Sequence, residues 1–314
     1  MAYTLAFDIG GTKIAYGAVS DKYPEEVVCT GTIAAQPEGS TLAAEFDRSV
    51  GLALAAAREA GIEPHRVGIG APGIVREGAI LRSGPTAPGW QGTVLADLVG
   101  KHTDAPIASG NDVRIWAYGE HHFGIGRKLA GRVFYISLGT GVGGAIVEDG
   151  QLMGGSTGSA GEFSELLVAD LRGHADRAES VCSGTGLARY YNVLAADPDF
   201  TGIIAWDRPA KEGDLDLYAI MERYHAGEEL ARNVVDGNLR GLGRALAGLA
   251  FGFDLDAVVI GGGVAGIGDP VFAAVREAFS AGAVDTHKDI PIVPSALGGM
   301  APLVGAAAYA RDKA

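Results

Sequence analysis

The chain has 314 residues with ordinary apolar (47%) and charged (20%) fractions, which is enough for about two globular domains. Its formal net charge of −13 argues against nucleic acid or an anionic membrane surface as a partner, and its two cysteines argue against a disulfide framework or a cysteine-built zinc site. Because the N-terminus lacks the basic region of a signal peptide and no apolar segment reaches the ~20 residues of a membrane span, we expect a cytoplasmic protein.

Short β-branched or apolar runs that end near glycine predict strands at residues 3–11, 13–20, 27–34, 66–73, 105–112, 132–141 and 257–263. Helical patterns lie between and after them, at residues 41–61, 112–124, 214–253, 269–282 and 298–313. The first helix has Thr41 or Ser40 as its N-cap and Gly61 as its C-cap, and the third is weakened by several glycines. Strands that alternate with helices predict an α/β fold.

Two segments about 130 residues apart resemble each other. Residues 6–19 and 135–150 both read as strand, Gly/Thr turn, strand. Two similar hairpins that head two halves predict two related α/β domains around a cleft. We place the boundary near Asp112. The smaller N-terminal domain is then 1–112 plus 300–314, with the C-terminal helix packed back onto it, and the larger domain is 113–299.

Glycine is unusually frequent, because 49 residues is about twice the usual ~7%. The pattern G-x-G-x-x-G occurs at residues 68–73, 139–144 and 261–266. A dinucleotide site needs this pattern between a strand and a helix, and only the third copy has that context, with Asp285 at the distance of a ribose carboxylate. A nicotinamide dehydrogenase therefore stays open as an alternative, although the motif lies late in the chain.

Phosphates can instead be held by the amides of tight hairpin turns, where glycine allows a close approach to the anion. Asp8, at the end of the first strand, could hold Mg²⁺ directly or through water. The first hairpin turn offers a glycine pair, a hydroxyl and a cation from Gly10, Gly11, Thr12 and Lys13. The second turn would contact the phosphates from the opposite side, through Gly139, Thr140 and Gly141. The alternative interpretation is two β-hairpins with flexible turns.

From about residue 4 to 310 the chain resembles the ROK family of sugar kinases and repressors, which has the actin-like (ribonuclease H-like) ATPase fold. Five segments carry the resemblance in order and spacing: LAFDIGGTKIAYGAV, VGIGAPGIV, GND, SLGTGVGGAIVEDGQLMGGSTGSAGE and VVIGGGVAG. The family's repressors have an additional N-terminal DNA-binding domain. We expect none here, because the phosphate motif begins at Asp8.

The resemblance implies ATP and Mg²⁺ in a cleft between the domains, with both glycine turns at the phosphates and with Gly262 and Gly263 near the nucleotide. It implies that Asp112 of the G-N-D motif is the catalytic base, beside Asn111 as a ligand of neighbouring sugar hydroxyls. Asp112 also suits the N-cap of the following helix, and the two roles are compatible. The resemblance further implies a homodimer.

One segment departs from the family pattern. Many members continue from G-E-I-G-H into a C-x-C-G-x-x-G-C-x-E zinc loop. Here Glu162 and Glu179 match the two sugar-binding glutamates, whereas Glu165 replaces the histidine and Arg177 replaces a cysteine. A structural zinc site needs four N or S ligands. We therefore expect no zinc, with salt bridges or packing shaping this loop.

These observations predict an ATP-dependent kinase for the 6-hydroxyl of a glucose-like hexose. A carboxylate only accepts hydrogen bonds, so Glu165 beside Glu162 and Glu179 favours a substrate with an ammonium group, such as glucosamine or kanosamine. The alternatives are an ordinary glucokinase, in which Glu165 binds hydroxyls or pairs with Arg172 or Arg177, and a non-catalytic sugar sensor. Another phosphoryl donor, such as polyphosphate, also stays open.

Overall fold

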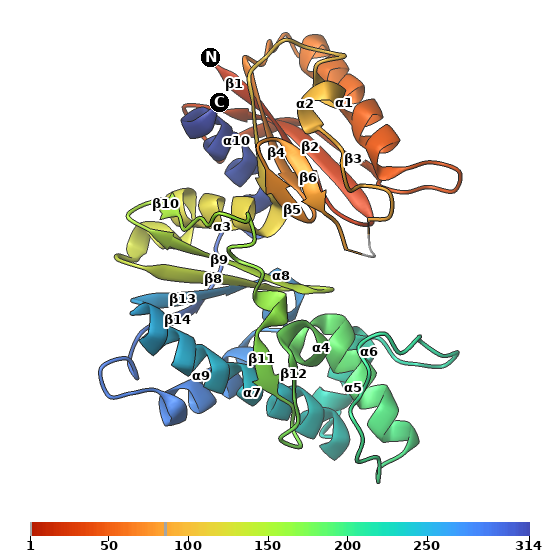
Figure 1. Cartoon of the computed structure of the whole chain (residues 1–314), viewed down its shortest axis with the longest axis vertical. Helices are drawn as coiled ribbons and strands as arrows, with labels where there is room; N and C mark the ends of the chain where they lie inside the picture. The colour runs from red at the N-terminus through yellow and green to blue at the C-terminus, as the bar shows by residue number, and fades with distance from the viewer. Residues whose placement is uncertain (1, 85–86) are drawn as a thin grey trace. The chain divides into compact units, whose positions relative to one another are not determined.

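The structure is a computed structural model of the full chain, and it describes residues 2–84 and 87–314 (Figure 1). The chain forms two compact units. Unit 1 comprises Met1–Lys128, Gly150–Ala160 and Ser295–Ala314, and unit 2 comprises Leu129–Asp149 and Gly161–Pro294. Both units are of the predicted α/β class. Among the described residues, no helix combines the length and the apolar character that crossing a membrane requires.

Unit 1 is built on a five-stranded sheet. The five strands of this sheet are β1 (Tyr3–Ile9), β2 (Lys13–Ser20), β3 (Val27–Ala34), β4 (Arg66–Ala71) and β7 (Ile107–Asn111). Strands β5 (Ile74–Arg76) and β6 (Ala79–Arg82) form a separate pair, and β10 (Gln151–Leu152) is an edge strand of the second five-stranded sheet. The helices of unit 1 are α1 (Leu42–Glu59), α2 (Leu95–Val99), α3 (Asp112–Phe123) and α10 (Ala301–Lys313), with 3-10 turns η1 (Ile125–Lys128) and η3 (Gly298–Met300). The sheet order is β3-β2-β1-β4-β7, with β1 antiparallel to β2 and parallel to β4.

Helices cover both faces of this sheet because successive side chains of a strand point to opposite faces. Phe7 of β1 contacts Phe46 of α1 edge-on, and Phe46 contacts Trp90 in the same way, with ring centroids 5.4 and 6.4 Å apart. All three rings are fully buried. Ala6, the neighbour of Phe7, instead packs on the side of α3 and α10. The core therefore fixes the strand ends from both sides of the sheet.

Glycines allow α10 to pack closely against the rest of unit 1. A Cβ atom on Gly305 of α10 would lie 2.1 Å from the Ile115 oxygen of α3, and one on Gly68 of β4 would lie 2.0 Å from the Ala306 oxygen. No side chain fits at such distances, so these positions require glycine. The predicted return of the C-terminal helix to the N-terminal domain is therefore observed.

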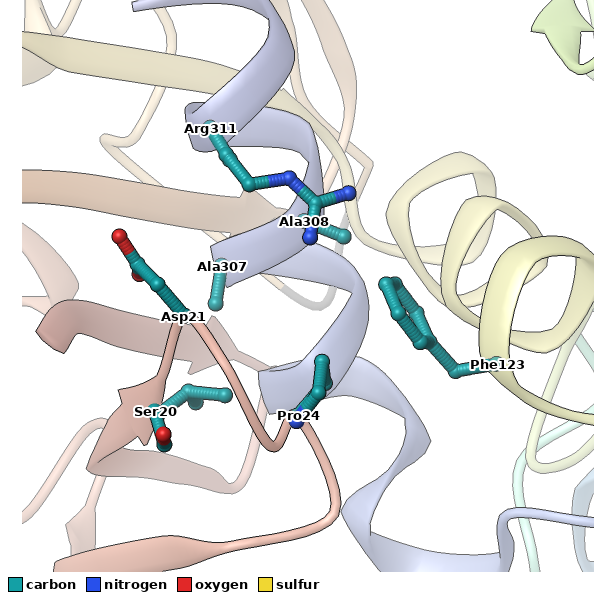
Figure 2. A pocket seen from close by; sticks show the side chains of 8 residues that line it. Ser20, Asp21, Pro24, Phe123, Ala307, Ala308 and Arg311 are labelled. Atoms are coloured by element: carbon teal, nitrogen blue, oxygen red, sulfur yellow. The ribbon is translucent and has the colours of Figure 1, made fainter. Parts of the chain in front are cut away.

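Figure 2 shows a small cavity on another side of α10. Ala307 and Ala308 face Asp21 and Pro24 after β2, and the guanidinium of Arg311 lies 5.4 Å from the ring centre of Phe123. The cavity holds about 10 Å³, about the room of one water molecule. It is a packing gap that is too small for a metabolite.

Unit 2 repeats the strand order of unit 1. Its strands are β8 (Val133–Leu138), β9 (Val142–Glu148), β11 (Leu167–Ala169), β12 (Ala175–Arg177), β13 (Ala257–Gly261) and β14 (Ile292–Pro294). Its helices are α4 (Ala178–Cys182), α5 (Gly184–Ala196), α6 (Leu217–Ala226), α7 (Glu229–Phe253), α8 (Gly262–Ala265) and α9 (Asp269–Gly282), with the 3-10 turn η2 (Phe163–Glu165). Strand β8 is antiparallel to β9 and parallel to β13, as β1 is to β2 and β4. The two hairpins predicted to be related thus occupy equivalent places in their sheets.

Two boundaries differ from the prediction. The compact units divide after Lys128, where we expected a boundary near Asp112, because α3 packs closely against α10 and so belongs to unit 1. The helix expected over 214–253 is two helices, α6 and α7. Gly227 between them has a φ of +92° and ends α6 with a left-handed residue, which interrupts the helical hydrogen bonds.

Candidate active site

The first glycine turn lies between β1 and β2 in unit 1, as predicted. The Gly10 amide donates to the Lys13 oxygen at 2.9 Å and closes the hairpin. The Gln36 side chain donates to the Gly11 oxygen at 2.8 Å, and the Ala35 amide donates to the Thr12 oxygen at 3.0 Å. Thr12 and Lys13 are exposed. The turn is therefore held from its β3 side, while its hydroxyl and its cation face solvent.

Asp8, at the end of β1, carries an unusual carboxyl group. Burial raises its pKa from 3.8 to about 6, although the nearby Lys13 ammonium acts in the opposite direction. The surrounding protein therefore disfavours the ionised form, which a further cation would stabilise. Hard divalent cations such as Mg²⁺ prefer carboxylate oxygen. Asp8 thus fits the predicted magnesium ligand.

The G-N-D motif joins β7 to α3 in the same unit. The Asn111 side-chain oxygen accepts a hydrogen bond from the Arg114 amide at 3.1 Å, and its side-chain nitrogen donates to the Gly73 oxygen at 3.1 Å. The N-cap is therefore Asn111, where the sequence suggested Asp112. Asp112 is the first helical residue, and its Oδ1 accepts from the Val113 amide at 2.9 Å. The helix start fixes the position of this carboxylate.

The second glycine turn lies between β8 and β9 in unit 2. The Gly139 amide donates to the Gly141 oxygen at 2.9 Å. The start of α5 holds the turn from outside, because the Gly184 amide donates to the Gly139 oxygen at 2.8 Å and the Thr185 hydroxyl donates to the Thr140 oxygen at 2.7 Å.

The Ser-Gly-Thr segment that opens α5 was not singled out from the sequence. Ser183 is the N-cap of α5 and accepts a hydrogen bond from the Gly186 amide at 2.9 Å. In the sequence, the segment that holds the second glycine turn is marked only by this N-cap serine and by the Gly184 and Thr185 that follow it. Its contact with a turn more than 40 residues earlier is a tertiary feature.

Glu179, predicted to bind sugar, also contacts the second glycine turn. Its Oε2 accepts a hydrogen bond from the Val142 amide at 3.1 Å. A Cβ atom on Gly141 would lie 2.4 Å from the same oxygen, so glycine at this position makes room for the carboxylate. Within unit 2, a predicted sugar ligand and a predicted phosphate turn are thus directly connected.

The third glycine cluster follows β13. Gly262 has a φ of +85°, and a Cβ atom there would lie 2.4 Å from the Leu138 oxygen of β8, so this position requires glycine. A Cβ atom on Gly263 would meet nothing within 4 Å. The backbone at Gly263 therefore has open space beside it.

Glu162 directly precedes the η2 turn, and Glu165 is the last residue of that turn. The Leu166 oxygen at the end of this turn accepts from the Ala178 amide at 2.7 Å, which joins it to the start of α4 and hence to Glu179. Glu165 Oε1 lies 3.4 Å from Arg177 Nη1, and the Arg177 guanidinium lies 4.7 Å from the ring centre of Trp206. The alternative that paired Glu165 with Arg177 is thus the arrangement observed.

A buried carboxylate organises the segment that departs from the family's zinc loop. The Asp170 side chain is fully buried and accepts hydrogen bonds from Arg172 Nη2 at 2.8 Å and from the His174 amide at 3.0 Å. Burial acts to raise the pKa of Asp170, but these bonds and the Arg172 charge hold it below its usual range. Over residues 2–84 and 87–314, no group of three or more His, Cys, Asp or Glu side chains is arranged to hold a metal ion.

The predicted site residues form two groups. Unit 1 carries the first glycine turn, Asp8 and the G-N-D pair, and unit 2 carries the second and third glycine clusters and the three glutamates. The glycine clusters, Asp8 and the G-N-D pair lie at strand ends or directly after them, whereas the three glutamates lie at η2 and in α4. The strand ends of an α/β sheet are where ligands are usually bound.

Comparisons with known proteins identify the family. The family model described as ROK family matches residues 4–313. The glucokinase of Streptomyces coelicolor is 32% identical, over 99% of this chain and 98% of its own length. The N-acetylmannosamine kinase of Escherichia fergusonii is 30% identical, over 91% of each chain.

Solved structures give the same result. The crystal structure of a ROK family glucokinase from Streptomyces griseus, in complex with glucose and AMPPNP, has a TM-score of 0.78 and 31% identity and covers 99% of each chain. The ROK hexokinase from Thermus thermophilus has a TM-score of 0.79 and 28% identity, over 99% of this chain and 98% of its own. With its paired hairpins, its G-N-D helix start and a family match over nearly its whole length, this chain belongs to the ROK family.

Proposed function

We propose that the protein is an ATP-dependent hexose kinase that phosphorylates the sugar's 6-hydroxyl. The observation that carries the proposal is Asp112, a carboxylate fixed at the first position of α3 by the Asn111 cap. Support also comes from the relatives, which include glucokinases and a structure that holds glucose and an ATP analogue.

In this reaction Asp112 accepts the proton of the 6-hydroxyl while that oxygen forms a bond to the γ-phosphorus. The bond from the γ-phosphorus to the bridging oxygen breaks, and ADP leaves with that electron pair. The amides of the turns at Gly10 and Gly139 are suited to stabilise the phosphate charge. The Asn111 amide, already bonded to Gly73 and Arg114, chiefly positions Asp112.

Magnesium belongs to the same proposal. When bound, it would neutralise charge on the transferring phosphates. Asp8 would hold it directly or through water, because burial makes its ionised carboxyl unfavourable and a bound cation would stabilise that form. Lys13 is exposed at the start of β2 and would meet a phosphate oxygen.

For the sugar, we propose a neutral glucose-like hexose bound by the three glutamates, Glu162, Glu165 and Glu179. The Arg177 guanidinium supports this choice, because it already meets the charge of Glu165. An amino sugar such as glucosamine or kanosamine is the second candidate, supported by the acidic residues that gather around η2 and α4. Its ammonium group would have to compete with Arg177 for Glu165.

The first experiment measures sugar-dependent ADP release over a panel of hexoses, with ATP and with polyphosphate as donors. A response to hexose supports a kinase, whereas ADP release without a sugar effect indicates an ATPase and binding without turnover indicates a sensor. NAD reduction would instead support a dehydrogenase. The ratio kcat/KM for glucose, glucosamine and kanosamine, in wild type and Glu165→His, decides between the two sugar classes.

The second experiment removes the proposed base. Asp112→Asn should retain the fold and most sugar affinity while lowering kcat at least ~10²-fold, because general-base catalysis is lost. Asp97→Asn removes one exposed carboxylate from α2 of the same unit and serves as the control. Near-normal turnover of Asp112→Asn would refute the assignment.

A further inference from the structure

The chain between α5 and α6, residues 197–216, is a long loop without helix or strand. Loops of this length within a compact unit usually carry a function. Ile204 of this loop is fully buried, whereas Trp206, two residues later, is 47% exposed. Tryptophan is on average highly buried. The loop is therefore packed onto unit 2 at Ile204 and presents an aromatic ring directly beside that point.

Hydrogen bonds fasten this loop around the exposed ring. The Asn192 side chain of α5 donates to the Leu215 oxygen at 2.8 Å and accepts from the Leu215 amide at 2.9 Å. The Arg208 amide donates to the Ala205 oxygen at 3.2 Å and closes a turn that contains Trp206. Because these bonds do not involve the indole, the backbone of the loop sets where the indole lies.

The indole of Trp206 meets the one arginine that contacts a proposed sugar ligand. The guanidinium carbon of Arg177 lies 4.7 Å from the ring centre of Trp206, and its Nη1 lies 3.4 Å from Glu165 Oε1. A guanidinium is planar, so it stacks through its face and donates hydrogen bonds through its edge. Both contacts can therefore be made at once, and the loop reaches Glu165 through a single side chain.

The ion pair alone would hold Arg177 weakly. A separation of 3.4 Å is long for an N–H···O bond, and the Glu165 side chain is 65% exposed to solvent. The Arg177 side chain is only 29% exposed, and an indole is the best aromatic partner for a cation. The stacking on Trp206 therefore supplies the hold that the ion pair lacks.

The backbone brings Arg177 to the site without fixing where its charge points. Arg177 pairs with Leu167 in the hairpin of β11 and β12, so it lies between Glu165, two residues before Leu167, and Glu179, two residues after itself. A long arginine side chain has many rotamers and could turn to either glutamate or to solvent. The partner that selects one direction is Trp206.

We propose that Trp206 is a positioning residue that holds the Arg177 charge at Glu165 and thereby sets the preference of the site for a neutral sugar over one with an ammonium group. An ammonium group gains a strong, charge-assisted hydrogen bond from a carboxylate, but here it would have to displace the guanidinium or bind beside it. The effect on specificity rests on the proposed kinase function, whereas the hold of Trp206 on Arg177 does not.

Three variants and one control test the proposal. Trp206→Leu removes the aromatic face but keeps an apolar side chain, Trp206→Phe restores an aromatic face, and Arg177→Gln removes the charge itself. Phe200→Leu is the matched control. Phe200 belongs to the same loop, and its ring centre lies 5.8 Å from the guanidinium of Arg172. That arginine pairs with Asp170, which is not a proposed sugar ligand.

The hold on Arg177 is measured without ligand, as the ¹⁵N heteronuclear NOE of the Arg177 Nε–H group, whose signal is identified by its loss in Arg177→Gln. In Trp206→Leu we expect this NOE to fall at least ~2-fold, because the released side chain moves on the picosecond to nanosecond timescale. Trp206→Phe should restore much of it, and Phe200→Leu should keep the wild-type value. A wild-type NOE in Trp206→Leu would overturn the positioning role.

Specificity is measured as the ratio of kcat/KM for glucosamine to that for glucose, at a temperature at which all variants are folded. We expect this ratio to rise at least ~5-fold in Arg177→Gln and about 2–5-fold in Trp206→Leu, less in Trp206→Phe, and to stay unchanged in Phe200→Leu. The rise should come from a lower KM for glucosamine, because neither residue is assigned to the reacting atoms. Trp206→Leu carries the test alone if Arg177→Gln does not fold.

Two outcomes would contradict the effect on specificity. An unchanged ratio in Trp206→Leu despite a lowered NOE means that the direction of the Arg177 charge does not select the sugar. An equal loss of kcat/KM for both sugars means that Trp206 contacts the sugar itself. If wild type phosphorylates no hexose, the proposed function is wrong and the effect on specificity is refuted with it, and the ligand-free NOE still decides whether Trp206 positions Arg177.

Discussion

Replacing Asp8 by asparagine should stabilise the protein and inactivate it. The pKa of Asp8 is raised from 3.8 to about 6, so the folded state binds the proton more tightly than the unfolded state does. Its stabilising contribution is complete below about pH 4 and is lost as the pH rises through about 6. At pH 7.5 the ionised carboxylate therefore disfavours the folded state.

The size of the effect follows from the shift. One pKa unit corresponds to 1.36 kcal/mol, so a shift of about two units gives about 3 kcal/mol as an upper bound. The Asp8 side chain is only half-buried by accessible surface, and we therefore expect Asp8→Asn to gain about 1–3 kcal/mol at pH 7.5. Asparagine carries no charge at either pH, so the gain should vanish at pH 4.

The assay is thermal unfolding at pH 4 and pH 7.5, with and without millimolar Mg²⁺. Mg²⁺ should raise the Tm of wild type at pH 7.5 and have little effect on Asp8→Asn, because the carboxylate that would hold it is gone. Asp97→Asn controls for removal of a negative charge. An Asp8→Asn variant that is less stable than wild type at pH 7.5, or whose gain is equal at both pH values, would refute the reasoning.

Three further outcomes are expected. Asp170→Asn should lower the free energy of unfolding by about 3 kcal/mol at pH 7, because it leaves Arg172 without its buried partner. In urea unfolding this loss should shrink as the pH falls through the depressed pKa of Asp170, and an equal loss at pH 3 would contradict the prediction. Activity should survive prolonged chelation once Mg²⁺ is restored, with well under one zinc per chain by metal analysis, and stoichiometric zinc would show that ligands were missed. Gly305→Val should lower Tm strongly or prevent folding, because its Cβ would lie 2.1 Å from the Ile115 oxygen, whereas Gly248→Ala, in open space on α7, should not.

Local sequence determined much of this protein. The strands that carry the site, the two related hairpins and the helix that starts at the G-N-D motif were predicted, because alternating apolar residues, glycine turns and caps act over a few neighbouring residues. Gly10 and Gly139 form hairpin turns for the same local reason. The division into two α/β halves followed from the repeated hairpin.

Tertiary structure decided what depends on partners distant in the sequence. Asn111 rather than Asp112 caps α3, Arg177 is the partner of Glu165, and the Asp170 cluster organises the loop that departs from the family's zinc motif. The placement of α3 in unit 1 depends on its close approach to Gly305, nearly 200 residues later. A hydrogen-bond or packing partner is chosen by proximity in the folded chain, and no periodicity within one segment records which distant residue will be near.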